Sequence, residues 1–203
     1  MYPPPHYSDN SPAFLADVMR QHSFALMTMA GPNGLLAVHL PFVLKDEGEF
    51  GTLYGHISKN NPQAALLNKP TDTMVVFTGP HAYISASWYN EPARRVPTWN
   101  YISVQAKGYP VLLPKESYMN EMALLTSKYE TDDGWAISKA ADYAEKIIAG
   151  IVYFKIPLSS LSGIRKMSVN KNKTENENVI KHLQAKGETE TAKAMKLAIA
   201  DVL

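Results

Sequence analysis

The amino-acid sequence predicts a mainly β protein, an antiparallel barrel with helices packed around it. Many short apolar runs separated by turn residues lie within the first 113 residues, and the longer helical patterns follow them. Prolines and glycines fall between these runs rather than inside them, which supports the division into strands. With 203 residues, 45% of them hydrophobic, the chain can bury a single core.

The first half of the chain is expected to form one helix and most of the strands. Ser11-Pro12 is an N-cap followed by proline, which predicts a helix over residues 12–22. Two apolar runs around Gly31-Pro32-Asn33-Gly34 predict a hairpin, and Asn61-Pro62 opens a short helix. The strands are expected at residues 23–29, 35–44, 52–57, 73–78, 81–85, 98–107, 109–113 and, later, 151–156.

The second half is expected to be mostly helical. Helical patterns cover residues near 115–129 and 139–149. In the tail, Thr174-Glu175-Asn176-Glu177 has the pattern of a capping box, which predicts a helix to about Gly187. Another helix follows from Thr189.

Composition limits the classes of function. Twenty basic and nineteen acidic residues leave a net charge of +1, so any contact with DNA is expected to be local. The lack of cysteine excludes disulfides, thiolate nucleophiles and cysteine-type zinc sites. We find no signal-peptide pattern and no apolar run near the ~20 residues that span a bilayer, which predicts a cytoplasmic protein with no membrane partner.

One face of the predicted strands carries an unusual set of side chains. Splitting the strands by their period of two gives core faces such as Leu36, Val38 and Leu40. The opposite faces are aromatic, rich in hydrogen-bonding groups and charged only at Lys107. Faces of this kind are typical of contact with a partner or a planar ligand. They hold Ala37, His39, Pro41, Val43, Tyr54, His56, Ser58, His81, Tyr83, Ser85, Ser87, Trp99, Tyr101, Ser103 and Gln105.

Two alternatives compete with this interpretation. A helix could cover the face, although a helix-covered face would favour Val, Ile and Leu. His39, His56 and His81 could form a zinc site with an open position. No carboxylate lies near them in the sequence to support such a site, so no metal is expected.

Five segments in fixed order carry a resemblance to a known family. Together they closely resemble the PaiB-type family of FMN-binding negative transcriptional regulators, and the resemblance covers nearly the whole chain. The segments are Ala37–Pro41, Gly55–Gln63, Gly79–Ser85, Ser87–Tyr89 and Val96–Tyr101.

The resemblance implies a fold and an assembly. The fold is the FMN-binding split barrel, an antiparallel Greek-key β-barrel with surrounding helices and a C-terminal helical tail. It forms a homodimer with FMN in the cleft between subunits. Residues 1–160 would form the barrel domain with its packed helices, and residues 161–203 a basic loop and a helical hairpin packed on the same domain.

The resemblance also implies a cofactor site. Tyr54–Pro62 resembles the flavin-phosphate segment of pyridoxamine-phosphate oxidases, in which a Ser and a Lys or Arg follow a strand. Ser58 and Lys59 would therefore contact the FMN phosphate, assisted by Asn60 or His56, because a dianion leaving water needs a cation and donors. The flavin ring would meet His39, Leu40, Pro41, His81, Trp99, Tyr101 and Gln105.

The tail departs from the family pattern. Where the family has an aromatic residue before Lys and then Leu-Ser-Gln-Asn-Arg, this chain has Arg165, Met167, Val169 and Lys171. The two tail helices could form a helix-turn-helix. A stripe of Met195, Ile199 and Val202 instead favours a helix that packs on the domain.

Two functions stay open at this point. By resemblance the chain is a repressor of programmes such as protease production and sporulation, with a DNA or regulatory protein partner. Alternatively it is a flavin-dependent oxidoreductase related to pyridoxamine-phosphate oxidase-like or haem-degrading split-barrel proteins. His39, His81 and Tyr101 are then acid–base candidates by residue type, and no catalytic residue is assigned.

Overall fold

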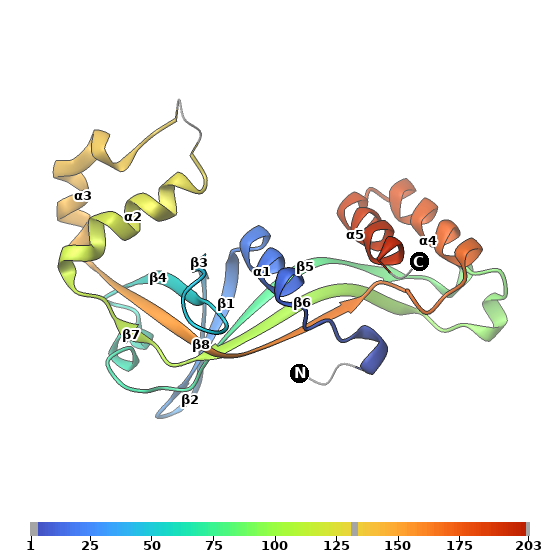
Figure 1. Ribbon diagram of the computed structural model, residues 1–203, viewed down its shortest axis with the longest axis horizontal. Coiled ribbons are helices and arrows are strands. Elements are labelled where there is room, and N and C mark those ends of the chain that lie inside the picture. Colours follow the sequence, from blue (N-terminus) through green and yellow to red (C-terminus); the bar gives the residue numbers. More distant parts are fainter. Residues whose placement is uncertain (1–3, 131–133, 202–203) are drawn as a thin grey trace. The chain divides into compact units, whose positions relative to one another are not determined.

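The computed structural model describes residues 4–130 and 134–201 (Figure 1). Met1 and Tyr2, where the family resemblance begins, and Val202 of the predicted stripe lie outside them. The strands are β1 (Phe24–Gly31), β2 (Gly34–Pro41), β3 (Val43–Lys45), β4 (Thr52–Ser58), β5 (Thr73–Ile84), β6 (Thr98–Gly108), β7 (Val111–Leu112) and β8 (Ile151–Lys166). The helices are α1 (Pro12–Gln21), α2 (Tyr118–Ser127), α3 (Ala141–Ile148), α4 (Lys173–Ala185) and α5 (Thr189–Ala200), with 3₁₀ turns such as η2 (Pro62–Leu66).

These strands form one antiparallel sheet in the order β2-β1-β5-β6-β8-β4-β3, and β7 pairs with β8. The two strands at the ends of this order, β2 and β3, are joined by the single residue Phe42. The sheet must therefore curl until its edges approach, as in a barrel. The predicted antiparallel barrel with surrounding helices is confirmed.

The predicted hairpin is confirmed. β1 pairs with β2 from Phe24 opposite Pro41 to Gly31 opposite Gly34. The two-residue loop Pro32-Asn33 closes the turn, and Gly34 takes a positive φ of 115° that side chains rarely adopt.

The chain divides into two compact units. The barrel unit comprises residues 19–77 and 105–161, and the tail unit comprises residues 4–18, 78–104 and 162–201. The barrel unit has an aromatic core in which Phe42 contacts Phe77 and Phe154 edge to face, with centroids 6.2 and 6.4 Å apart. All three rings are buried.

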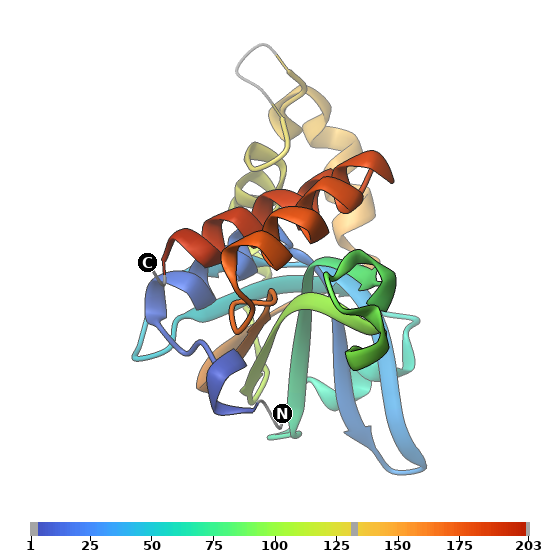
Figure 2. The same cartoon turned by 90° about the vertical axis from the view of Figure 1, so that its right-hand side faces the viewer.

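In the tail unit, α4 and α5 lie side by side over the strands (Figure 2). Leu183 of α4 and Met195 of α5 are fully buried. Asn100 of β6, also fully buried, donates its side-chain amide to the sulfur of Met195 at 3.7 Å. Of the predicted packing stripe on α5, Met195 is thus buried and Ile199 is half-buried.

Several element boundaries differ from the sequence-based expectations. β5 is one strand running through Gly79-Pro80, because proline is compatible with extended backbone. β7 covers only Val111–Leu112 of the expected strand at 109–113. Residues 115–117 form a 3₁₀ turn before α2.

The last strand is the largest difference. β8 continues to Lys166, far beyond the expected end at residue 156, so the predicted basic loop begins as a strand. Gly163 does not end it. A Cβ atom there would lie 2.3 Å from the Asp9 carbonyl oxygen, so glycine is required by a close approach of the backbone.

The predicted capping box at Thr174 is wrong by two residues. α4 begins at Lys173, and the Asn172 side chain accepts a hydrogen bond from the Glu175 amide at 2.9 Å. Asn172 and Glu175 are three residues apart, as are the N-cap and N3 residues of the expected pair, Thr174 and Glu177. The Glu175 carboxylate binds Arg95 instead of returning to the cap.

Candidate functional site

The predicted phosphate-binding residues lie at the end of β4 in the barrel unit. Ser58, Lys59 and Asn60 are all exposed. The Ser58 hydroxyl accepts from the Asn60 amide at 3.2 Å, and the Lys59 ammonium donates to the Ala149 carbonyl. An ammonium has three donors, so Lys59 keeps two for another acceptor. A hydroxyl, a cation and a carboxamide are thus accessible at one strand end.

The residues predicted to run beside the flavin ring lie on β2 of the same unit. His39 is exposed and stacks on Phe24, with centroids 5.7 Å apart and planes 24° from parallel. Leu40 and Pro41 are half-buried, as is Gln105 of β6. Phe24 itself is 65% exposed. An open apolar and aromatic surface therefore adjoins His39.

His56 occupies a different environment. With Tyr54 and Tyr153 it lines a cavity of about 10 Å³ that α2 closes through Glu121 and Leu125. For the outer face of β4, the alternative that a helix covers it is therefore correct. Burial lowers the pKa of His56. Burial and the nearby negative charge of Glu121 both raise the pKa of Tyr153.

Three buried polar atoms around this cavity have no hydrogen-bond partner among the described residues. They are His56 Nδ1, Glu121 Oε2 and the Tyr153 hydroxyl. The cavity has about the volume that one water molecule needs, and a buried water typically bonds two to four such groups. Sequence reasoning missed Glu121 and Tyr153 because each lies on an element far from His56 along the chain.

The stability of the protein should fall as pH decreases below about 6.5, the ordinary pKa of histidine. The pKa of His56 is lower in the folded state, so the unfolded state binds the proton first and is favoured on acidification. Chemical denaturation between pH 8 and 5 measures this. The variant His56→Gln should show a shallower pH dependence over this range, and an unchanged profile would contradict the assignment.

The remaining predicted residues lie in the tail unit. His81, Tyr83, Trp99 and Tyr101 form what we term the aromatic face. Trp99 is 52% exposed and lies 6.5 Å from the His81 ring and 6.1 Å from the Tyr83 ring, between centroids. Tyr101 is half-buried. The structure thus brings His81 and Trp99 together on an open surface.

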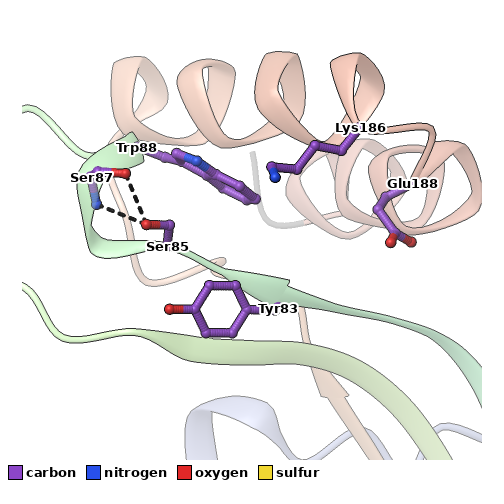
Figure 3. A pocket seen from close by; sticks show the side chains of 6 residues that line it. All are labelled: Tyr83, Ser85, Ser87, Trp88, Lys186 and Glu188. Atoms are coloured by element: carbon purple, nitrogen blue, oxygen red, sulfur yellow. Dashed lines mark hydrogen bonds between the residues drawn. The ribbon is translucent and has the colours of Figure 1, made fainter.

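A cavity of about 410 Å³ adjoins the aromatic face at Tyr83 (Figure 3). Ser85 and Ser87, whose hydroxyls are 2.8 Å apart, line it together with the buried Trp88. The Trp88 ring stacks on His182 of α4 with centroids 5.2 Å apart. The side chains drawn in Figure 3 surround this hollow from β5, from the 3₁₀ turn that follows it and from the turn after α4.

Two general properties bear on the class of site. Within residues 4–130 and 134–201, no group of three or more His, Asp or Glu side chains is arranged to hold a metal ion. None of the helices described is both long and apolar enough to cross a membrane.

Comparison with known proteins identifies the class. A family model described as "Putative FMN-binding domain" matches residues 1–160. The "FAD and Heme binding protein" of Mycobacterium smegmatis has the same fold, with a TM-score of 0.60 and 14% identity over 79% of this chain and 73% of that one. The flavocytochrome Anf3 of Azotobacter vinelandii gives a TM-score of 0.58 at 12% identity, over 79% and 69% of the two chains. The chain is therefore an FMN-binding split-barrel protein.

The particular family follows from a full-length relative. The chain is 32% identical to the "Protease synthase and sporulation protein PAI 2" of Bacillus subtilis, over 100% of this chain and 98% of that protein. The chain belongs to the PaiB-type family of FMN-binding proteins, as the resemblance predicts. FMN is its cofactor.

The residues at the end of β4 fit one part of this cofactor. A phosphate dianion needs a cation and hydrogen-bond donors, and Lys59, Ser58 and Asn60 present them to solvent. The exposed rings of the aromatic face have the flat apolar surface that a flavin ring contacts.

Proposed function

We propose that the chain is a cytoplasmic, homodimeric, FMN-binding negative transcriptional regulator of the PaiB type. The observation that carries this proposal is the aromatic face, where Tyr83 and Trp99 are 47% and 52% exposed beside His81 with no charged side chain among them. Aromatic residues are enriched and charged residues depleted in the buried centres of protein interfaces. The name of the Bacillus subtilis relative supports a role in controlling protease production and sporulation.

The proposed cofactor site consists of the residues that the family resemblance implies. Ser58 and Lys59, with Asn60 or His56, hold the phosphate. The flavin ring meets residues of one or both subunits, namely His39, Leu40, Pro41, His81, Trp99, Tyr101 and Gln105. In this proposal the state of bound FMN biases a surface that meets DNA or a regulatory protein.

The variant Lys59→Ala should bind FMN about 10- to 150-fold more weakly, because a charge-assisted hydrogen bond contributes about 1.5–3 kcal/mol. Fluorescence titration of the flavin measures the affinity. Riboflavin, which lacks the phosphate, should bind both proteins equally. Lys69→Ala is the matched control, because Lys69 is also exposed in the barrel unit. Unchanged FMN affinity in Lys59→Ala would remove Lys59 from the phosphate site.

The dimer is tested by sedimentation of the full chain with and without FMN. Wild type should sediment as a dimer with one FMN per chain. Trp99→Lys should shift the population toward monomers and lose FMN, because a charge cannot be buried unpaired at the proposed interface. Tyr143→Lys, which changes an exposed residue of α3, should remain dimeric and keep FMN. A monomeric wild type indifferent to FMN would refute the proposal.

An FMN-dependent oxidoreductase is the second candidate, and His81 is the observation that favours it. Its Nδ1 lies 3.0 Å from the Gly79 carbonyl oxygen, which only accepts, so Nδ1 carries the proton and donates. The neutral ring then presents Nε2 as a base on the exposed aromatic face. Bound FMN would supply hydride or electron transfer.

One experiment separates the two candidates. The bound flavin is reduced with NADH or NADPH and its reoxidation is followed with candidate acceptors. Steady turnover that His81→Gln slows would favour the enzyme. No turnover, together with salt-sensitive retardation of promoter DNA, would favour the regulator.

A further inference from the structure

A second cavity in the tail unit, of about 290 Å³, is lined by an unusual concentration of positive charge. Four cationic side chains contribute to it, together with the rings of two tyrosines. We term it the basic pocket, and these six residues are Arg94, Arg95, Lys166, Lys171, Tyr7 and Tyr89. None of them belongs to the proposed flavin site.

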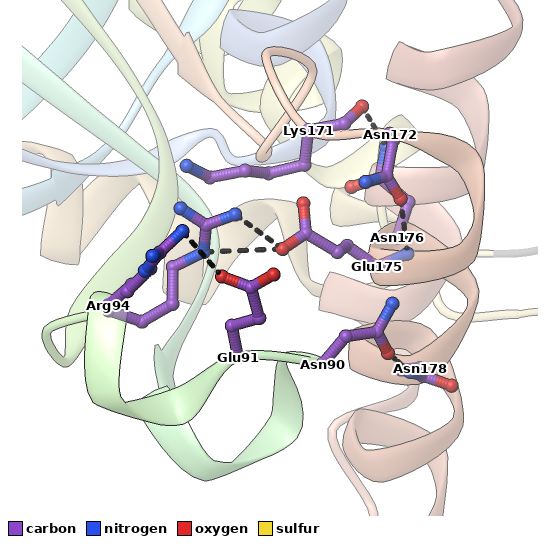
Figure 4. A network of polar contacts seen from close by, with 9 residues as sticks. Asn90, Glu91, Arg94, Lys171, Asn172, Glu175, Asn176 and Asn178 are labelled. Atoms are coloured by element: carbon purple, nitrogen blue, oxygen red, sulfur yellow. Dashed lines mark hydrogen bonds and ion pairs between the residues drawn. The ribbon is translucent and has the colours of Figure 1, made fainter.

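Two of the four cations are neutralised locally (Figure 4). Arg94 pairs with Glu91 at 3.3 Å, and both side chains are largely exposed. Arg95 pairs with Glu175 at 2.6 Å, and the Glu175 side chain is only 5% exposed. These two ion pairs leave the charge of both lysines uncompensated.

The lysines contact neutral groups instead. The Lys166 ammonium donates to the Thr98 hydroxyl at 2.6 Å and lies 5.7 Å from the centroid of the Tyr7 ring. The Lys171 ammonium lies 6.0 Å from the Tyr89 ring. Within residues 4–130 and 134–201, neither lysine forms an ion pair with a carboxylate. Both are half-buried, so an anion between them would offset the cost of their partial desolvation.

The wall of the pocket is built from buried polar groups. Asn100 is fully buried and Ser168 is 4% exposed, and the Ser168 hydroxyl donates to the Asn100 side-chain oxygen at 3.0 Å. Among the described residues, Ser168 is the only non-glycine residue with positive φ, at 59°. Such backbone conformations cost about 1–3 kcal/mol and cluster at functional sites.

Two tyrosine side chains also line this pocket. Burial raises the pKa of Tyr7 and of Tyr89, so both hydroxyls keep their protons at neutral pH. The pocket therefore offers two uncompensated ammonium groups beside two protonated tyrosine hydroxyls, of which that of Tyr7 donates to the Asn170 side-chain oxygen at 3.4 Å. This donor set suits a group with two negative charges and several acceptor oxygens.

From this geometry we propose that the basic pocket binds a phosphate monoester dianion, with Lys166 and Lys171 as its cationic contacts. The cavity of about 290 Å³ is larger than a phosphate group, so the organic part of the ligand lies against the Tyr7 and Tyr89 rings. A small phosphorylated effector, separate from the FMN held at Lys59, would supply this group.

The test is calorimetric titration of the full chain with phenyl phosphate in phosphate-free buffer. Wild type should bind it, and the neutral analogue phenol should not. Lys166→Gln and Lys171→Gln should each weaken binding about tenfold or more, because each removes a charge-assisted contact. Lys181→Gln, an exposed residue of α4, is the matched control and should bind like wild type.

Further arms complete the test. Lys171→Arg keeps the charge and should keep measurable binding, which guards against a folding defect in the glutamine variants. Binding that persists at saturating FMN supports a site separate from that of the flavin, and binding that FMN abolishes would overturn it. Absence of phenyl phosphate binding to wild type, or wild-type affinity in both glutamine variants, would overturn the proposal. Neither result would change the expected FMN response of Lys59→Ala.

Discussion

The variant Phe42→Ala should lose about 3–5 kcal/mol of unfolding free energy, the usual cost of removing a buried phenylalanine. Phe42 is 1% exposed and is the one residue between β2 and β3, where the barrel closes. Its ring contacts Phe77 and Phe154. Gly55 leaves room for it, because a Cβ there would lie 3.1 Å from the Phe42 ring. Truncation would leave a cavity that three strands border.

Chemical denaturation followed by circular dichroism measures this loss. Phe24→Ala is the matched control, because Phe24 is 65% exposed on neighbouring β1. It should change stability by about 0.5 kcal/mol or less. If Phe42→Ala and Phe24→Ala were equally stable, the packing of the Phe42 ring would not contribute to the stability of the barrel.

The variant Met195→Ala should lose about 2–5 kcal/mol, because Met195 is fully buried and its removal creates a cavity. It also deprives the buried Asn100 amide of its 3.7 Å contact with sulfur. An effect of this size requires α5 to be an integral part of the tail unit. A DNA-recognition helix that did not pack against the rest of the unit would tolerate the change.

Leu197→Ala tests the same helix from the outside. Leu197 lies two residues further along α5 and is 60% exposed. The substitution should alter thermal stability little, since alanine has the higher helix propensity. Equal losses from Met195→Ala and Leu197→Ala would contradict the burial pattern of α5.

Local signals in the sequence were sufficient for most of the fold. Pro12 after Ser11 marked the start of α1, and Gly31 and Gly34 marked the hairpin turn. The strict alternation through Leu36, Val38 and Leu40 identified the less exposed face of β2, on which all three side chains are half-buried rather than part of the core. These features depend on neighbouring residues only, so one sequence is enough to detect them.

Features that depend on distant backbone could not be predicted. Gly163 marks a strand end by its type, yet β8 continues through it because the Asp9 carbonyl approaches there. Thr174 fits a capping box as well as Asn172 does, and the Glu175 carboxylate that accompanies the Asn172 cap binds the distant Arg95. Nothing in the local sequence reports either contact.

The candidate site shows the same limit. His56 and His39 have equivalent places in the alternation of their strands. One is enclosed under α2, whose residues lie more than 60 positions later, and the other is exposed. An aromatic and polar strand face therefore indicates that something covers it, without distinguishing a helix of the same chain from a ligand or a second subunit.

Arg165 of β8 has a consequence for the two ends of the described chain. Its guanidinium binds Asp9 at 2.8 Å and Asp201 at 2.5 Å, so one side chain joins the segment before α1 to the end of α5. Terminal segments of most domains fray independently. Here trimming residues near Asp201 would also loosen the segment at Asp9. Affinity tags and protease cleavage at one end should therefore be judged by their effect on amide exchange at the other.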